Sequence, residues 1–466
     1  MSLAIVWLRH DLRLADNPLL QFASPPEQLL CVYVLDSAWL SPQPGLEVTP
    51  VGPARLRFLW ESLIALRGEL LKRGSDLLVR VGNPVAVVAE LAECYGATQV
   101  HVRRDAGWDE SQQVAQLAEQ LGEGVELLQQ DGGLLLDEAT LPVALSGLPS
   151  SFSAFRRKVE RHWSVPPAIP APVTLPPWPD AAPRGFPPLQ NVCCEASNWL
   201  PDERGGFCFA GGEAEGQARL DHYLHESGGV ARYKQTRNGL LGADFSTRLS
   251  PWLAHGCLSA RQVHDGVRAW ESRYGANESS YWVIFELLWR DYFHWAARQE
   301  GRALFGRREL PMTNPAFEAW REGRTGVPFI DAAMRELAAT GWLSNRARQN
   351  VASFLVKDLG VDWQLGAAWF EHALIDFDMA SNWGNWRYLA GVGRDTRDRW
   401  FHVLKQADHY DPEGNYVAHW QPELAALPPG RARHQPWRVQ PERFAAPLVV
   451  PEAWRAALLP TGDPSG

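Results

Sequence analysis

Polar and aromatic residues that could support redox chemistry lie close together in residues 374–388, LIDFDMASNWGNWRY. Asp376 and Asp378 are two residues apart, and Asn382 precedes Trp386 by four. Positions four apart share one face of a helix. We therefore expect the Asn382 amide, which can hydrogen-bond the edge of a ring, to lie beside the Trp386 indole, which can pass an electron. This combination favours a redox-active aromatic cofactor over hydrolysis.

A second group of candidate residues lies in residues 281–293, YWVIFELLWRDYF. Glu286, Trp289 and Arg290 are spaced by three and four residues, so they share one helical face. Burying a carboxylate among so many aromatic rings is costly unless the carboxylate is paired or functional. Two interpretations remain open: a Glu–Arg ion pair that ties helices together, or an acid that acts on a bound molecule.

Two further segments carry hydroxyl, amide and guanidinium groups. Residues 245–251, FSTRLSP, precede a helical pattern. Short hydroxyls and free amides in that place favour phosphate, although ordinary helix caps look the same. In residues 341–354, Asn345, Arg348 and Gln349 again share a face. The alternative there is a solvated arginine, and spacing alone leaves both alternatives open.

The elements that must position these residues fall into two patterns. Strand-like and helical stretches alternate over residues 1–130, which predicts a Rossmann-like α/β domain with a parallel sheet. No GxGxxG fingerprint follows the first strand, so this pattern alone predicts no dinucleotide there. The expected strands are 4–8, 29–35, 77–81, 98–103 and 125–129, and the expected helices are 55–73, 84–95 and 109–121.

The rest of the chain is predicted to be helical. Ten prolines between residues 166 and 188 exclude a helix or a central strand there, and they predict that this stretch is extended. It lies within an interdomain connector expected over residues 131–210. A larger all-α domain is expected over residues 211–427. We expect the Pro- and Arg-rich tail, 428–466, to be only partly ordered. The expected helices are 214–226, 260–274, 281–299, 328–340, 345–359 and 363–374.

Composition narrows the class of protein. The 466 residues carry a formal net charge of −9, which argues against a nonspecific nucleic-acid coat protein but allows a local basic groove. The six cysteines include no CxxC pair and none beyond Cys257, which argues against zinc ribbons and against an iron–sulfur cluster in the C-terminal half. No apolar run is long enough to span a membrane, and no signal peptide is evident. We therefore expect a cytoplasmic monomer without metal or membrane partner.

These four segments and a fifth, residues 391–424, resemble the photolyase/cryptochrome family and its DASH-type branch in their order along the chain and in their spacing. The resemblance extends over about residues 3–425 and includes WLRHDLRLADNPLL near the N-terminus. It implies an antenna domain followed by an all-α domain that binds FAD noncovalently. Residues 246–250 match the family's Thr-Ser-x-Leu-Ser signature, with Ser in the first place, which holds the FAD diphosphate and ribityl. The FAD-binding residues implied are Tyr233, Ser246, Thr247, Arg248, Leu249, Ser250, Arg348, Asp376, Asp378 and Asn382.

The same resemblance implies a pocket for damaged DNA. Glu286 would be the acid that hydrogen-bonds a cyclobutane pyrimidine dimer and stabilises its radical anion, and Trp289 would be the wall on which the flipped dimer stacks. Asn345 would contact the lesion, and Arg348 would pair with Asp376. The DNA-binding residues implied are Arg237, Glu286, Trp289, Arg290, Asn345, Gln349, Tyr388 and Gln406, with Arg394, Arg397 and Arg399 at phosphates.

An electron path to the flavin is also implied. Asn382 would face N5 of the flavin ring, Trp386 would be the tryptophan nearest to the flavin, and Trp363 would be the middle member of the path. The distal member is missing, because residues 309–312 are ELPM; Trp320 is the nearest alternative. The catalytic residues implied are Glu286, Trp289, Asn345, Asn382, Trp386 and Trp363.

Three positions distinguish between branches of the family. The (6-4) photolyases have two adjacent histidines where this chain has Ser344 and Asn345. Gln349 replaces the methionine, and Tyr388 a tryptophan, of other cyclobutane photolyases, and both replacements are DASH-like. A smaller stacking wall at Tyr388 should weaken capture of a dimer from duplex DNA. Glu110 occupies the place where some photolyases hold a folate antenna, which implies 5,10-methenyltetrahydrofolate, although neighbouring antenna positions are not matched.

We therefore predict a deoxyribodipyrimidine photo-lyase. It would repair cyclobutane pyrimidine dimers in light, with single-stranded or loosened DNA preferred, by electron transfer from excited reduced FAD. The alternative is a blue-light photoreceptor that binds FAD and signals without repair; it would not need Glu286, Trp289 or Asn345. A thermal flavin oxidoreductase is a third interpretation, for which the chain shows no recognisable nicotinamide site.

Overall fold

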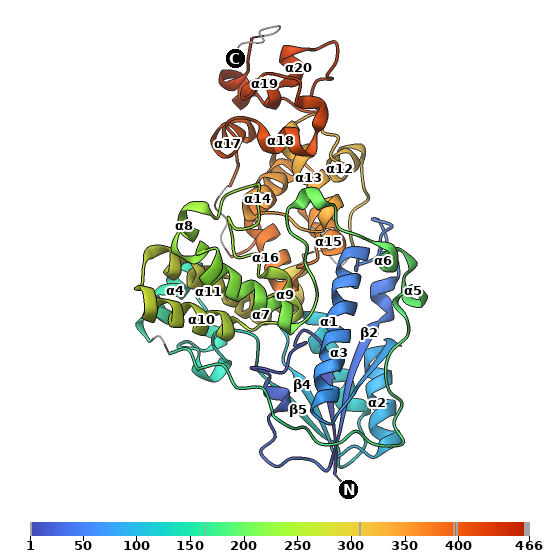
Figure 1. Ribbon diagram of the computed structural model, residues 1–466. Coiled ribbons are helices and arrows are strands. Elements are labelled where there is room, and N and C mark those ends of the chain that lie inside the picture. Colours follow the sequence, from blue (N-terminus) through green and yellow to red (C-terminus); the bar gives the residue numbers. More distant parts are fainter. Residues whose placement is uncertain (1, 163, 307–308, 395–396, 398, 461–466) are drawn as a thin grey trace.

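The structure, a computed structural model, describes residues 2–162, 164–306, 309–394, 397 and 399–460. A parallel sheet lies at one end of the molecule, with strand order β3-β2-β1-β4-β5 (Figure 1). Every neighbouring pair is parallel, so the predicted Rossmann-like α/β domain is confirmed. The strands are β1 Leu3–Leu8, β2 Gln28–Asp36, β3 Leu77–Gly82, β4 Gln99–Arg103 and β5 Glu126–Gln130.

Alternate residues of the central strand β1 enter two different cores. Val6 belongs to the cluster that includes the buried face of α1 (Pro53–Lys72). Trp7 belongs to the cluster formed with α2 (Pro84–Tyr95) and α3 (Trp108–Gln120). Both faces of the sheet are therefore covered, as is usual for parallel sheets. The strand order reverses between β1 and β4, which opens a crevice at the carboxyl ends of these strands.

The remainder of the chain is helical, as predicted. The expected helices 260–274 and 328–340 are observed with the same bounds. Two others, expected at 214–226 and 345–359, end in π-helical turns, His222–Glu226 and Phe354–Asp358. The helices that matter for the site are α7 Glu213–Asp221, α8 Tyr233–Thr236, α9 Ser250–His255, α10 Ala260–Tyr274, α11 Glu278–Glu300, α13 Pro328–Thr340, α14 Asn345–Ser353, α15 Trp363–Ala373 and α16 Met379–Ala390.

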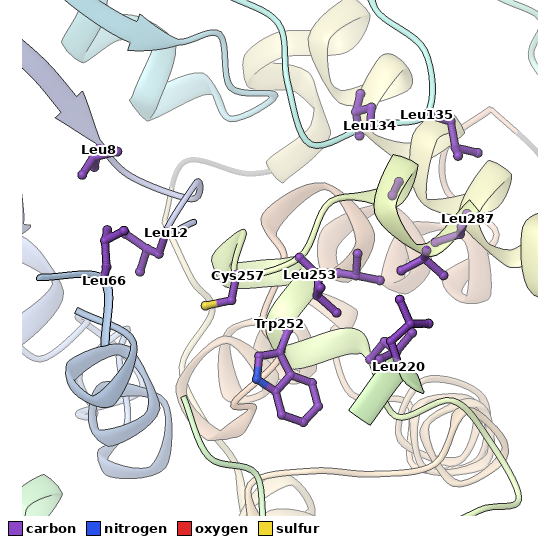
Figure 2. Packing of buried hydrophobic residues seen from close by; sticks show 14 of the residues in the cluster. Leu8, Leu12, Leu66, Leu134, Leu135, Leu220, Trp252, Leu253, Cys257 and Leu287 are labelled. Carbon is purple, nitrogen blue, oxygen red and sulfur yellow. The ribbon is translucent and has the colours of Figure 1, made fainter. Parts of the chain in front are cut away.

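One hydrophobic cluster joins the sheet to the helices. Figure 2 shows Leu8 and Leu66 near the sheet, together with Trp252 and Leu287 from α9 and α11. All four side chains are at most 6% exposed. Burial of this continuous apolar surface fixes the helical part against the carboxyl ends of the strands.

The proline-rich stretch 166–188 contains no helix, as predicted. Elsewhere in residues 131–210 the chain does form helices, among them α4 (Phe152–Arg161), whose buried face packs against α11. The expectation of an only partly ordered tail needs correction, because the tail forms α19 (Arg431–His434) and α20 (Pro436–Val439). Both lie with α17 (Val403–Tyr410) at the end opposite the sheet (Figure 1). Buried Trp437 and Trp454 anchor the tail in the helical core. These apolar residues indicated an ordered tail, but the prediction gave more weight to its many prolines. The proposed division into domains stays a prediction.

Two further features concern what the described residues lack. No helix in the described ranges is both long and apolar enough to cross a membrane. The same residues contain no group of three or more His, Cys, Asp or Glu side chains placed to hold a metal ion.

Candidate functional site

A cavity of about 500 Å³, here called the central cavity, opens between α8, α9, α11, α14 and α16. It brings together most of the residues predicted from the sequence. A narrower recess of about 90 Å³ shares part of its wall and adds Asn382 and Trp386. The predicted residues that line the central cavity are Tyr233, Arg237, Ser246, Thr247, Arg248, Leu249, Ser250, Glu286, Trp289, Arg290, Asn345, Arg348, Gln349, Asp376, Asp378 and Tyr388.

The hydroxyl-rich segment forms a loop that ends at the start of α9. The cap residue of α9 is Leu249, and no side chain caps the helix. Ser246 and Thr247 are therefore not used as ordinary helix caps, although both line the cavity. A helix N-terminus with uncapped amides and two nearby hydroxyls suits a phosphate group.

Arg219, which no sequence motif marked, holds this loop in place. Its guanidinium donates hydrogen bonds to the backbone oxygens of Thr247 (2.9 Å), Ser246 (3.0 Å) and Ala243 (3.1 Å). It also pairs with Asp244 at 2.7 Å. These partners lie 24 to 28 residues further along the chain, so local spacing contains no sign of them.

The Arg248 side chain stabilises the conformation of this loop. Its φ of 53° is left-handed, an uncommon conformation for a residue with a side chain. The guanidinium lies 4.3 Å from the ring centre of Trp342 and 5.1 Å from that of Phe245, and it donates to the Gly242 oxygen at 2.6 Å. Cation–π contacts of this kind fix the loop conformation. Arg248 was predicted to bind the cofactor, but its charge is committed to the loop.

Glu286 and Arg237 form an ion pair across the central cavity. The interpretation in which Glu286 pairs with an arginine is thus partly confirmed, but the partner lies after α8 rather than on α11. The Glu286 side chain is 32% exposed, toward the cavity. Burial raises the pKa of its carboxyl, and the Arg237 charge and the neighbouring Trp282 act in the opposite direction. Arg237 was expected at a DNA phosphate, whereas here its charge is engaged by a carboxylate.

Arg290, which was expected to bind DNA, instead bonds to backbone oxygens of the protein. Its guanidinium donates to the backbone oxygens of Gly133 at 2.9 Å and Leu253 at 3.1 Å. It lies 3.7 Å from Asp378, and its side chain is 13% exposed. These bonds tie α11 to a loop of the N-terminal part and to α9, which disfavours the predicted contact with DNA.

The Trp289 ring is supported from behind. Phe152 of the connector stacks on it, with ring centres 3.8 Å apart and planes 14° apart. Tyr388 meets it edge-on at 5.8 Å, and the Arg399 guanidinium lies 3.4 Å from the Tyr388 ring centre. Because Phe152 occupies one face and both Trp289 and Tyr388 line the cavity, they form a firm aromatic wall there.

The predicted Arg348–Asp376 ion pair is confirmed. Arg348 Nη2 lies 2.7 and 3.0 Å from the two carboxylate oxygens, and its Nε donates to the Leu343 oxygen at 3.0 Å. The Asp376 side chain is only 2% exposed. Nearby, Asn382 donates its amide N–H to the Ala367 oxygen at 3.0 Å, so its own oxygen remains to accept a bond in the recess.

The aromatic side chains near Trp386 separate into two groups. Trp386 is buried and packs edge-on to Phe370 (5.1 Å) and Trp320 (6.2 Å). Trp320, named from the sequence as the alternative distal member of the electron path, therefore lies beside Trp386. Trp320 itself is fully buried. Trp363 lies one helical turn before Gly366, against which the Trp386 ring packs. Trp363 also contacts Trp383 at 5.8 Å.

Three other predicted residues lie outside the central cavity. The Gln406 oxygen, on α17, faces Arg346 and Asn350 at 3.4 and 3.5 Å. Arg394 pairs with Glu300 at 2.6 Å. Glu110 lines a second cavity of about 660 Å³, the sheet-side cavity, at the carboxyl ends of the strands.

Comparisons with known proteins agree with this geometry. Residues 4–174 match a family model described as DNA photolyase, and residues 282–458 match the FAD binding domain of DNA photolyase. The chain therefore belongs to the photolyase/cryptochrome family. Among proteins named cryptochrome DASH, it is 46% identical to that of Gloeobacter violaceus, over 96% of this chain and 91% of that protein. It is 41% identical to that of Xenopus laevis, over 97% of this chain and 90% of that one.

Solved structures give the same result. A cryptochrome from Synechocystis sp. PCC6803 superposes with a TM-score of 0.90 at 39% identity, covering 97% of each chain. A bacterial class III photolyase from Agrobacterium tumefaciens gives 0.82 at 26% identity, covering 98% of this chain and 96% of that one. The predicted family, its DASH-type branch and the two-part fold are thus confirmed.

Proposed function

We propose that this protein repairs cyclobutane pyrimidine dimers in light, with single-stranded or loosened DNA preferred. The observation that carries the proposal is that one cavity holds two sets of groups. The Arg348–Asp376 pair, with the neighbouring Asn382, is suited to a flavin ring. Glu286, together with Trp289 and the Phe152 ring behind it, is suited to two linked bases that are flipped out of the strand. Arg348, Asp376, Glu286 and Trp289 line the same space, and Asn382 lines the adjoining recess, so an electron donor and a lesion could meet there.

The residues present fit FAD. Uncapped amides at the start of α9 and the hydroxyls of Ser246 and Thr247 would hold the diphosphate, and Arg219 would keep that loop in shape. The Asn382 oxygen, aimed by its bond to Ala367, would accept a hydrogen bond from the flavin edge. Bound in reduced form, FAD would supply the light-driven electron, while the protein supplies position and electrostatics.

The chain's own groups would hold the lesion. Stacking on an aromatic side chain contributes roughly 1–3 kcal/mol per base, and flipping a base out of a duplex costs a few kcal/mol. Trp289 can therefore offset much of that cost, but only when it is held still, which Phe152 does. Glu286 is held by Arg237 and would bond to the base edge. A strand that is already unpaired avoids most of the flipping cost, which supports the single-strand preference.

We also propose that the sheet-side cavity holds the antenna. It lies next to the central cavity and contains Glu110, the position that implied a folate. Carboxylates there, among them Asp109 and Glu110, could accept hydrogen bonds from the amino-substituted ring of 5,10-methenyltetrahydrofolate. Aromatic side chains such as Trp39 and Phe377 line the same space and could pack against the ring.

The deciding experiment is illumination of the purified, chemically reduced protein with single-stranded DNA that carries one cyclobutane thymine dimer. Dimer loss in light but not in a dark control would support the photolyase. Relatives of this chain are named cryptochromes, which keeps a photoreceptor as the second candidate. Absence of repair by a protein with spectrally demonstrated FAD would favour that candidate.

A further inference from the structure

Asp378 separates the two large cavities. Among the described residues, only Ala254 and Asp378 line both the central cavity and the sheet-side cavity. Asp378 is therefore the ionisable side chain common to the two spaces. A charge change on one side of it will be felt on the other, because the low-dielectric protein interior weakens an electric field less than water does.

The bonds of Asp378 are well defined. Oδ1 accepts the backbone N–H of Ser381 at 2.8 Å, which caps α16. Oδ2 lies 2.7 Å from Nε2 of His294 and 3.7 Å from Arg290. Burial alone would raise the pKa of the Asp378 carboxyl, but His294 and Arg290 outweigh burial and hold that pKa well below its usual value. Asp378 is therefore ionised throughout the physiological range.

His294, on α11, is the group near Asp378 that can change its charge near neutral pH. Its ring lines the sheet-side cavity, and the residue is 8% exposed. Burial lowers the pKa of His294 below its usual 6.5, and Asp378 acts in the opposite direction. At neutral pH the imidazole is thus neutral and donates its Nε2 hydrogen to Asp378.

The other charges that face His294 are fixed. Arg290 on the same helix and Arg103 at the end of β4 both lower the pKa of His294. Arg103 is itself paired with Asp105. Arginine stays protonated, so among the described groups that contact Asp378 only His294 can take up a proton to balance additional negative charge in the central cavity.

We propose that His294 takes up a proton from the sheet-side cavity when a flavin in the central cavity is reduced, and that it acts on the flavin through Asp378. The inference depends on the proposed function, since it requires FAD beside Asp378. Two electrons and one proton convert FAD to its anionic reduced form. The proton on His294 is an additional one, supplied by water in the sheet-side cavity and returned there on reoxidation. His294 is thus a positioning residue that stabilises the reduced state.

One substitution separates this role from a merely structural one. His294→Gln keeps an N–H donor within reach of Asp378 but cannot titrate. His255→Gln is the matched control, because His255 is also a buried histidine of the same cavity. Its Nε2 lies 3.0 Å from the Ile375 oxygen rather than from a carboxylate, and burial lowers the pKa of His255 to about 3.

The test is the midpoint potential of bound FAD, measured from pH 5.5 to 8.5 with dithionite as the electron source. One extra proton per two electrons steepens the dependence by about 30 mV per pH unit. The wild-type protein and His255→Gln should show this extra slope around neutral pH, and His294→Gln should lack it. Parallel slopes for all three proteins, with or without an offset, would overturn the proposal.

Two readouts keep this inference distinct from the proposed function. FAD content, read from the absorbance of the purified proteins, tests the proposed function, and a wild-type protein unable to bind FAD would overturn both. Histidine NMR of the apoprotein tests the coupling without flavin. Asp378→Asn should lower the pKa of His294 further there, and an unchanged pKa would refute the coupling.

Discussion

The Arg237 guanidinium contacts the Glu286 carboxylate inside the central cavity. The two residues lie 49 positions apart, on either side of the space where a lesion would bind. An arginine expected at DNA therefore orients the acid that would meet the damaged base. Such an acid is in place before substrate arrives, and its orientation costs nothing at the moment of binding.

Glu286→Gln should reduce repair without loss of FAD. A hydrogen bond to a charged group contributes about 1.5–3 kcal/mol, which corresponds to a roughly ten- to hundredfold lower repair rate. Initial rates of dimer loss under constant light, together with flavin absorbance, measure both quantities. Glu278→Gln, at an exposed carboxylate paired with Lys234, is the control and should repair normally. A repair rate for Glu286→Gln equal to that of the wild type would contradict the role assigned to this acid.

Arg348→Met should destabilise the protein. It leaves the Asp376 carboxylate, 2% exposed, without its counter-charge. Removing one partner of a buried ion pair costs about 3–5 kcal/mol, and the 26% exposure of Arg348 places the loss near the lower end. Urea unfolding of the apoprotein measures it. Arg321→Met, which breaks a partly exposed pair with Glu318, should cost less than about 1 kcal/mol. Equal losses in the two variants would contradict this account.

Gly366→Ala should weaken the packing around Trp386. A Cβ at this position would lie 2.3 Å from the Trp386 ring, so ring or helix must move. Overpacking of this kind costs about 1–3 kcal/mol. Gly68→Ala in α1 is the matched control, since its Cβ would meet nothing within 4 Å. The control should gain about 0.5–1 kcal/mol. Thermal unfolding distinguishes the two, and a stabilised Gly366→Ala would disprove the tight contact.

Glu336→Gln should remove part of the pH dependence of stability. Glu336 is 3% exposed, and burial raises its pKa to about 7, while the Tyr416 hydroxyl donates to it at 2.5 Å. Between the unfolded value and 7, the folded state binds more protons, so stability falls as the pH rises through this range. The group should cost about 3 kcal/mol above pH 7 relative to pH 4. Urea unfolding at pH 5 and 8 should show a smaller decline for the variant. Parallel declines would exclude Glu336 as the cause.

Phe152→Leu should impair lesion capture more than flavin binding. The substitution keeps an apolar side chain but removes the ring that stacks on Trp289 at 3.8 Å. Aromatic pairs contribute about 0.5–1.5 kcal/mol beyond buried area, so affinity for dimer-containing single strands should fall roughly two- to tenfold. Titration of a fluorescent oligonucleotide measures this effect. Phe155→Leu, one turn later and against Tyr292, is the control. Equal affinities for the wild type and Phe152→Leu would contradict the supporting role.

The sequence predicted best what depends on local spacing. Helix α10 followed from periodicity. The Arg348–Asp376 pair, whose members lie 28 residues apart, was implied only by the resemblance to a family. Without such a resemblance, the sequence did not predict contacts between distant segments. His294 meets Asp378 across 84 residues, and Arg219 organises a loop that begins 24 residues later. Such contacts depend on how helices and strands pack together, and the spacing of residues within one segment contains no information on that packing.

Phe152 precedes the helical region but contacts Trp289 within it, so the N-terminal and helical parts of the chain are not independent. Phe152 backs Trp289, and the backbone amides of Leu135 and Leu136 donate to the buried Asp291 of α11. Segments before residue 211 thus form part of the wall against which a base would rest. Chimaeras that exchange N-terminal halves between relatives would exchange part of their substrate selectivity too. The aromatic wall therefore depends on the N-terminal part of the chain as well as on the helices that follow it.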